Sequence, residues 1–379
     1  MKPLKILCGL LCLLLLASNV RSMSHWNEAR GVYDDVCYLR QAHLFQRFGL
    51  GGFDTDISRD DDHYFASKLK EVGFPTWNDV TTVPCHTPMP ATKKLVLQYP
   101  PGTGMALALF PQGNQVIPLF VTATLTMFGF ALLAIIAARS AAAVLVAGAF
   151  GCLAIYLMIN PSKASYSMAP TMMVCAAAGY LTARLFTAPP RHHLWLTMLL
   201  GLLLGATVDF RVANLFLSSG YFLFFLFSFL SSRTARIVVH GASFTVAYLI
   251  GMAPTLLANA INAGSPIATT YGGQDVAPPQ FSLSIVWQYV ADMQFVLLVL
   301  AGASIAFMLR AHRNDGARRV ALVTAVNLAV NLAFFLSHPV VTPYYTIPVA
   351  MLSLWSLLFG ALMQPSTAVA ERSEVTAIA

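Results

Sequence analysis

Two adjacent carboxylates, Asp34 and Asp35, follow the first apolar run of the chain and begin a stretch with helical periodicity. A carboxylate beside a hydroxyl can take its proton as a general base, or support positive charge that develops as a bond breaks. Acids at this position would also cap the free N–H groups of the helix and match its dipole. The residues alone leave both roles open, and the two roles are compatible.

A second candidate is Arg211, which lies close to Asp209 in a nearly continuous apolar stretch from 194 to 231. Charged groups at membrane depth are costly and usually face a cavity or a partner. A guanidinium can hold a phosphate through two parallel hydrogen bonds. Alternatively, its long side chain reaches the lipid headgroups. Residues two apart do not share a helix face, so Asp209 is not an expected helical partner for Arg211.

Further basic and aromatic residues lie in the outer connections of the chain. Lys93 and Lys94 precede a Tyr-Pro-Pro turn, where they could attract an anionic molecule or rest on lipid phosphates. The second interpretation is slightly favoured. His338 and Tyr345 flank the last outer connection, where they could contact a phosphate or a second substrate. An aromatic belt at the membrane interface would explain the tyrosine equally well.

Acidic residues and one histidine gather between positions 54 and 63. Oxygen ligands at close spacing suit Mg²⁺, Mn²⁺ or Ca²⁺, and Asp60, Asp62 and His63 are the candidate ligands. The glycine and the terminal glutamate of an EF-hand loop are missing. A solvated loop in which Asp60 or Asp61 caps the next helix is the simpler interpretation. A divalent cation is therefore a secondary expectation, and no other cofactor is expected.

Membrane-spanning helices must position these residues, because the composition excludes most other classes of protein. Of the 379 residues, 57% are hydrophobic and only 10% are charged, whereas about 25% are charged in an ordinary soluble protein. A soluble globular enzyme, a disordered protein and a disulfide scaffold are excluded. The net charge of +7 does not indicate a nucleic-acid partner, because the basic residues are dispersed between apolar runs.

Ten apolar stretches come close to the roughly 17–25 residues that cross a bilayer, and the fifth of them is short. They lie at 4–20, 115–138, 141–160, 167–186, 194–209, 212–231, 237–258, 288–309, 320–337 and 346–364. The sequence therefore predicts an all-α integral membrane protein with about ten transmembrane helices. On the ninth stretch, Asn327 and Asn331 share a helix face, which favours hydrogen bonds between helices.

The distribution of arginine and lysine predicts the orientation. With the N-terminus in the cytoplasm, the short outer loops hold only Lys163 and Arg211, and the other basic residues that flank spans lie inside. These inner residues are Lys2, Lys5, Arg139, Arg184, Arg191, Arg233, Arg236, Arg310, Arg313, Arg318, Arg319 and Arg372. Both termini are therefore expected in the cytoplasm.

This topology divides the chain into four parts. Residues 1–20 are a first transmembrane helix, which is favoured over a signal peptide. Residues 21–114 form a large first extracytoplasmic loop with amphipathic helices at about 34–48 and 62–72, suited to the membrane interface. An oxidising compartment would permit a disulfide between Cys37 and Cys85 of this loop, although the sequence leaves its geometry open. Residues 115–364 form the polytopic bundle, and 365–379 a short cytoplasmic tail.

Several sequence segments resemble those of a known family in their order along the chain and in their predicted position on the outer side of the membrane. They are Tyr33-Asp-Asp-Val-Cys-Tyr38, Tyr99-Pro-Pro-Gly-Thr-Gly104, Asp209-Phe-Arg-Val-Ala-Asn-Leu215 and Pro254-Thr-Leu-Leu-Ala-Asn259, with the later Gly264-Ser-Pro266 and Tyr271-Gly272. With the large first outer loop, they resemble the GT-C superfamily of integral-membrane glycosyltransferases, near the bacterial branch that uses polyprenyl-phosphate sugars. The chain looks most like the aminoarabinose and protein-mannosyl transferase types. The resemblance extends to about residue 350. Many members carry a soluble C-terminal domain, and some have more spans than the ten found here.

The resemblance implies transfer of a sugar from a polyprenyl-phosphate donor to an envelope glycan, lipid or protein acceptor on the extracytoplasmic side. By resemblance, the catalytic base is Asp34 or Asp35. The expected phosphate-binding residues are Arg211, Lys93, Lys94, His338 and Tyr345. The leaving group is already a phosphate, so no nucleotide is required. The expected setting is a bacterial plasma membrane, where the lipids themselves are partners.

Two other classes of function remain as alternatives. A multi-pass transporter would need a polar pathway near the middle of the membrane and ideally an internal repeat. No repeat is found, and the polar residues gather at the outer rim. A non-enzymatic envelope assembly protein would not need Asp34, Asp35 and Arg211 together.

Overall fold

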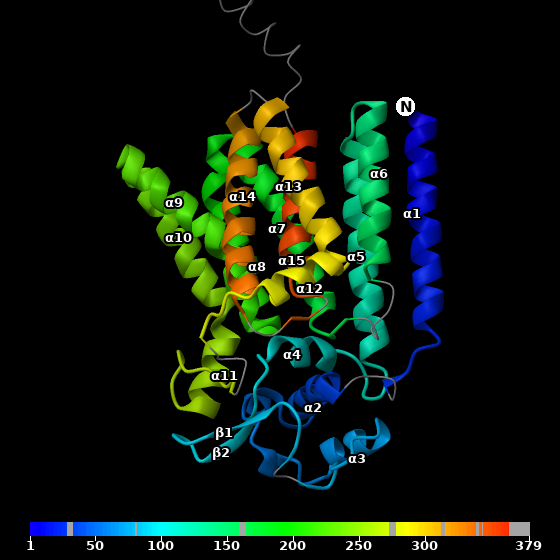
Figure 1. Cartoon of the computed structure of the whole chain (residues 1–379), viewed down its shortest axis with the longest axis vertical. Helices are drawn as coiled ribbons and strands as arrows, with labels where there is room; N and C mark the ends of the chain where they lie inside the picture. The colour runs from blue at the N-terminus through cyan, green and yellow to red at the C-terminus, as the bar shows by residue number, and fades with distance from the viewer. Residues whose placement is uncertain are drawn as a thin grey trace, which may run out of the picture.

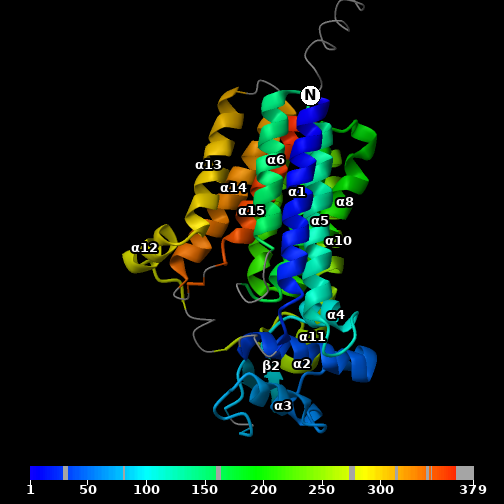
Figure 2. The same ribbon diagram turned by 90° about the vertical axis from the view of Figure 1, so that its right-hand side faces the viewer.

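The structure is a computed structural model that describes residues 1–28, 33–79, 82–158, 164–272, 278–311, 315–338, 341–342 and 344–363. The predicted cytoplasmic tail, 365–379, lies outside these residues. The described chain is nearly all helical and has two parts, a long helical bundle and a smaller cap at one end of it (Figure 1). A view from the side shows the same division (Figure 2).

Six helices of the bundle are long and apolar enough to cross a membrane. They are α1 (Lys2–Met23), α5 (Val116–Ala137), α8 (His193–Phe210), the continuous segment Val212–Ser232 that ends in α9 (Ser219–Ser232), α13 (Gln294–Ala311) and α14 (Asp315–Ser337). A bent pair, α10 (Ala235–Gly251) and α11 (Ala253–Ala263), brings the number to seven if it is one span. The chain is thus built as a polytopic membrane protein.

The difference from the predicted number of ten has local causes. The apolar helices α6 (Ala141–Tyr156) and α15 (Ile347–Leu362) have 16 residues each, which is short for a span. Helix α7 (Met168–Thr187) carries polar residues and Arg184 among its apolar ones. All three helices pack against other helices of the bundle, α6 on α1 and α5, and α7 on α15.

The seventh predicted span, 237–258, is broken in the structure. Helices α10 and α11 meet at Met252 with a bend of 52°. Pro254 lies in the first turn of α11 and lacks the N–H that would continue the ladder of α10. Instead, Oδ1 of Asp209 accepts hydrogen bonds from the Thr255 N–H at 3.0 Å and from the Thr255 hydroxyl at 2.6 Å. The buried carboxylate therefore holds the beginning of α11.

Small residues and amides join the spans closely. A Cβ at Gly205 of α8 would overlap the Tyr248 carbonyl oxygen of α10, so these two backbones are in direct contact. Asn327 Oδ1 on α14 accepts hydrogen bonds from the Ser219 hydroxyl at 3.0 Å and the Gly220 N–H at 3.1 Å. Asn331 donates to the Phe216 carbonyl at 2.8 Å. Both asparagines thus join neighbouring segments by hydrogen bonds, as their spacing predicts.

The cap contains the loop between α1 and α5 and the end of the broken span. Its elements are α2 (Tyr33–Phe48), the 3₁₀ turns η2 (Gly49–Phe53) and η3 (Ile57–Arg59), α3 (Tyr64–Glu71), the strands β1 (His86–Met89) and β2 (Lys94–Leu97), and α4 (Gly102–Ala108). The two strands form an antiparallel hairpin in which His86 pairs with Leu97. Figure 1 shows α11 beside them and the short α12 (Leu283–Ala291) at the level where cap and bundle meet.

Helix α2 is the central element of the cap. It packs on α4, η2 and α3, so the side chains from Asp35 to Ala42 are all buried. Buried Arg40 donates to the Thr55 carbonyl at 2.9 Å and to the Asp56 carbonyl at 2.8 Å. A disulfide between Cys37 and Cys85 joins α2 to the residue before β1. Other segments of the chain thus cover its polar face as well as its apolar one, and its position at the membrane interface stays a prediction.

Candidate functional site

Charged and aromatic side chains from four distant parts of the chain meet where the cap joins the bundle. Helix α2 contributes two aspartates, the loop before α7 contributes residues 164–167, the turn after α8 contributes Arg211, and the connection before α15 contributes two tyrosines. The structure thus brings Asp34, Asp35, Arg211 and Tyr345 into one region. We call this group the junction site.

Arg211 is half-buried and is held by aromatic rings instead of by a carboxylate. The centre of its guanidinium lies 4.8 Å from the Tyr344 ring centroid and 4.9 Å from the Tyr345 ring centroid, within cation–π range. Its Nη1 lies 3.7 Å from Met168 Sδ. Among the described residues, no carboxylate lies within ion-pair distance of Arg211. A cation in this state can bind an anionic ligand without breaking an existing salt bridge.

Asp35 points inward from α2 and is only 2% exposed. Its Oδ1 accepts a hydrogen bond from the Tyr166 N–H at 3.1 Å, which ties the loop before α7 to the cap. Burial raises the pKa of Asp35 to about 8, against the smaller lowering effects of the Tyr166 N–H, Ser165 and Arg211. The negative charge of neighbouring Asp34 raises this pKa further. At neutral pH Asp35 is therefore mostly protonated.

Asp34 lies on the accessible side of the same helix. Neighbouring residues on an α-helix point about 100° apart, so Asp34 reaches solvent while Asp35 does not. Enough protein surrounds the Asp34 carboxylate for desolvation to raise its pKa, and a hydrogen bond with the Tyr99 side chain lowers it in part. Of the two acids, Asp34 is the one that a molecule in solution can reach.

Tyrosines around the two acids were not predicted as site residues. Tyr38 stacks on Tyr99 at 4.8 Å between ring centroids, and Tyr99 meets Tyr271 edge to face at 6.1 Å. The Tyr38 hydroxyl interacts with the hydroxyls of Ser165 and Ser167, and burial raises its pKa. Tyr344, next to the predicted Tyr345, completes the cage around Arg211. Two signals could have indicated them: Tyr38, Tyr99 and Tyr271 lie in the segments that carry the family resemblance, and Tyr344 is next to Tyr345.

The remaining predicted phosphate-binding residues have other contacts. His338 stacks on Phe334 at 5.4 Å, and Tyr345 packs on the adjacent Phe335 at 5.5 Å. His338 thus lies near the edge of the junction site. Lys93 lies at the turn of the β-hairpin with a left-handed φ of 56°. Lys94 forms a salt bridge with Asp54 at 3.0 Å and donates to the Ile261 carbonyl at 3.3 Å.

Acidic side chains of the segment 54–63 form hydrogen bonds and ion pairs with other groups of the protein. The Asp60 carboxylate accepts the N–H groups of Phe65 at 2.8 Å and Ala66 at 3.3 Å, at the start of α3. Asp62 pairs with His43 at 2.7 Å. Within the described ranges, no group of three or more His, Cys, Asp or Glu side chains could hold a metal ion. Asp60, Asp62 and His63 are thus not assembled as ligands, because the first two carboxylates fix local structure.

No protein-family model, curated protein or solved structure matches this chain.

Proposed function

We propose that the chain is a membrane glycosyltransferase of the GT-C type, which moves a sugar from a polyprenyl-phosphate donor to an envelope acceptor. The observation that carries the proposal is the junction site. There an arginine without a carboxylate partner among the described residues lies in the same region as an accessible aspartate. A phosphate leaving group needs the first group, and an attacking hydroxyl needs the second.

The proposed reaction assigns one role to each group. The acceptor oxygen attacks the anomeric carbon of the sugar, and the bond between that carbon and the phosphate oxygen breaks. Asp34 takes the hydroxyl proton, because it is the accessible acid. Arg211 binds the departing lipid phosphate, whose added charge strengthens this ion pair as the bond breaks. Asp35 is a positioning residue, since its carboxyl holds the loop at Tyr166 rather than facing solvent.

The proposal includes the predicted topology. The six long helices, the bent pair α10–α11, and the shorter or less apolar α6, α7 and α15 together make ten crossings. Ten crossings would leave both termini in the cytoplasm and the cap outside, in a bacterial plasma membrane. The disulfide between Cys37 and Cys85 supports this side for the cap, because disulfides persist in oxidising compartments.

The test is mass spectrometry of envelope glycans and glycolipids from a deletion strain complemented with matched variants. Wild type should restore a missing sugar, and Asp34→Asn and Arg211→Ala should each lower that product by about 100-fold, typical of losing a general base or a charge clamp. Asp35→Asn should retain much of the activity, because an amide resembles a protonated carboxyl. Asp61→Asn, which removes an acid from the cap surface, is the matched control.

Two outcomes would contradict the proposal. An unchanged glycan profile in the deletion strain, under conditions in which the gene is expressed, would contradict the proposed transferase activity. Full rescue by Asp34→Asn and Arg211→Ala, with each variant present in the membrane at the wild-type amount, would show that these two residues are not required for the reaction. Transport assays would then be the next measurement.

A further inference from the structure

A cavity of about 470 Å³ opens at the end of the bundle opposite the cap. Five helices contribute to its wall: the last turn of α7, the first turns of α8, α10 and α14, and the second half of α9. Figure 1 shows α9 and α10 leaning away from the other helices toward this end. We call this hollow the distal cavity, and it lies far along the spans from the junction site.

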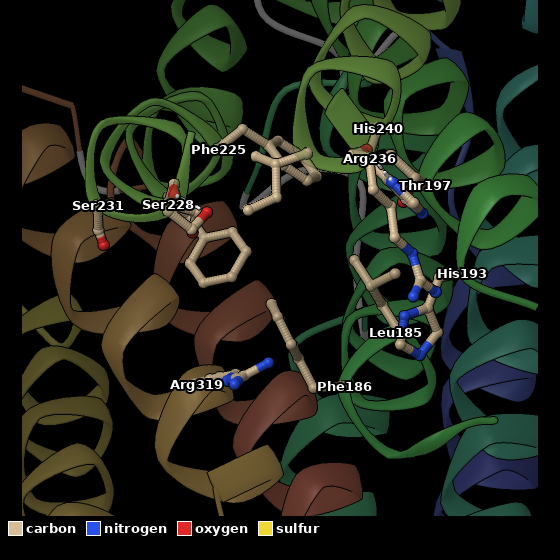
Figure 3. A pocket seen from close by; sticks show the side chains of 13 residues that line it. Leu185, Phe186, His193, Thr197, Phe225, Ser228, Ser231, Arg236, His240 and Arg319 are labelled. Atoms are coloured by element: carbon tan, nitrogen blue, oxygen red, sulfur yellow. Dashed lines mark hydrogen bonds between the residues drawn. The ribbon is translucent and has the colours of Figure 1, made fainter. Parts of the chain in front are cut away.

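The distal cavity is lined by basic side chains and contains no acidic one. Arg236, Arg319, His193 and His240 all line it, and none of its other lining residues is Asp or Glu. Figure 3 shows Arg319 reaching into the hollow from α14, while the other three basic residues lie on the opposite wall. Throughout the part of the chain that the structure describes, no salt bridge neutralises Arg319. The cavity is therefore positively charged.

Hydroxyl groups supply further donors in the same wall. Thr197 is fully buried, and its Oγ1 has no hydrogen-bond partner. A buried hydroxyl without a partner costs free energy, so an occupant that satisfies it would be favoured. Ser228 and Ser231 of α9 are also lining residues, and both are labelled in Figure 3. Guanidinium and hydroxyl donors around one space match the several acceptor oxygens of a phosphate group.

The apolar part of the lining decides between a lipid and a soluble anion. Leu185, Phe186, Phe224, Phe225 and Ile237 also line the cavity. Inorganic phosphate has no apolar surface to bury against these side chains, whereas the glycerol and upper acyl carbons of a phospholipid do. Basic pockets between transmembrane helices are typical sites for acidic lipid headgroups.

We propose that the distal cavity binds one anionic phospholipid from the leaflet at this end of the bundle. Its phosphate would lie between Arg319 and Arg236, with the Thr197 hydroxyl as an additional donor. Its acyl chains would leave past the phenylalanines of α9. This site is independent of the reaction at the junction site. It requires particular side chains, Arg236 and Arg319, whereas a general basic rim would attract acidic lipids through any of its basic residues.

The test uses the full-length protein in detergent, titrated with lipid and observed by native mass spectrometry. Phosphatidylglycerol should bind about tenfold more tightly than phosphatidylcholine, whose choline cation would face the arginines. Arg236→Gln together with Arg319→Gln should weaken phosphatidylglycerol binding about tenfold, roughly the loss of one good charged contact. Arg318→Gln is the matched control, because this exposed neighbour on the same turn of α14 does not line the cavity. It should change the affinity less than about twofold.

Three outcomes would overturn the proposal. They are an unchanged affinity in the double variant, an equal loss in Arg318→Gln, and displacement of the lipid by millimolar inorganic phosphate. The last outcome would assign the cavity to a soluble anion. The single variant Arg319→Gln, at an exposed position, provides a second measurement that does not depend on the folding of the double variant. An affinity for phosphatidylglycerol equal to wild type in that variant would also overturn the proposal.

Discussion

At the scale of single residues, the two neighbouring aspartates differ because of what surrounds each one. Asp35 is covered by the loop at Tyr166 and is mostly neutral at pH 7, while Asp34 keeps access to solvent beside Tyr99. The positive charge of Arg211 lowers the pKa of Asp35 in part. One helix turn thus presents a buried acid that contacts protein and an accessible acid that faces solvent.

The raised pKa of Asp35 predicts how stability depends on pH. An unfolded aspartate titrates near ~3.9, whereas Asp35 in the fold titrates at about 8. Between these values the folded state binds the extra proton, so the contribution of Asp35 to stability falls as pH rises and levels off above about 8. The slope from this one group is at most about 1.4 kcal/mol per pH unit.

Thermal unfolding midpoints of the purified protein, measured from pH 5 to pH 9, would check this prediction. The midpoint of wild type should fall across this range, and Asp35→Asn should make the curve flatter because the amide does not titrate. Asp34→Asn is the matched control, since its carboxylate is more accessible. Parallel curves for wild type and Asp35→Asn would show that Asp35 does not titrate in this interval.

At the scale of elements, the break between α10 and α11 depends on one carboxylate. Both hydrogen bonds from Thr255 end on the same oxygen of Asp209, inside a buried contact between α8 and α11. Asp209→Ala should lower the free energy of unfolding by about 2 kcal/mol, because it leaves a buried N–H and hydroxyl without an acceptor. Asp209→Asn keeps one acceptor oxygen and should cost less than about 1 kcal/mol.

Unfolding in mixed detergent micelles would measure both variants. Asn259→Ala is a suitable control on α11, because the hydrogen bond from Asn259 to the Pro266 carbonyl lies at the exposed surface. Equal losses for Asp209→Ala and Asp209→Asn would mean that the charge, rather than the acceptor geometry, holds α11 in place.

Local sequence patterns predict where many of the helices lie in the chain, but they seldom predict which residues pack against each helix. The apolar run 115–138 gives α5, and the periodic stretch 34–48 gives α2, since both patterns are contained within the element itself. The burial of α2 depends on contacts from residues far away, such as Tyr166, which lies 131 positions from Asp35. The hairpin was missed because its strands have four residues each and no clear alternation.

The candidate site shows the same limit. Residue types at Asp34, Asp35 and Arg211 indicate what chemistry is available, and the structure places all of them in the junction site. Which aspartate is accessible follows only from the packing of α2. The tyrosine cage of Arg211 forms because residues 344 and 345 return to the end of α8, which no local pattern indicates. By contrast, the sequence does indicate the bend between α10 and α11, because Pro254 lies within the predicted seventh span.

At the scale of the whole molecule, the bundle separates two chemically different ends. The cap carries the disulfide and the acid-rich loop, while the opposite end carries Arg139, Arg236 and Arg319 at the helix termini. The start of α1 and the end of α15 lie at this opposite end (Figures 1 and 2). If the molecule spans a membrane with the basic end inside, the two ends must face different compartments.

Single cysteines on the two ends would test this arrangement in intact cells with a membrane-impermeant maleimide. Asn78→Cys, exposed on the cap, should be labelled from outside, whereas Ala141→Cys, exposed at the start of α6, should be labelled only after the membrane is permeabilised. The four free native cysteines are buried or half-buried in the helices, so wild type should give little signal. Labelling of both positions from outside would place cap and distal cavity on one side, and the reversed pattern would move the junction site to the cytoplasm. The first result would contradict the membrane-spanning arrangement. The reversed pattern would contradict a reaction on the extracytoplasmic face, because the acids and Arg211 lie at the cap end of the bundle.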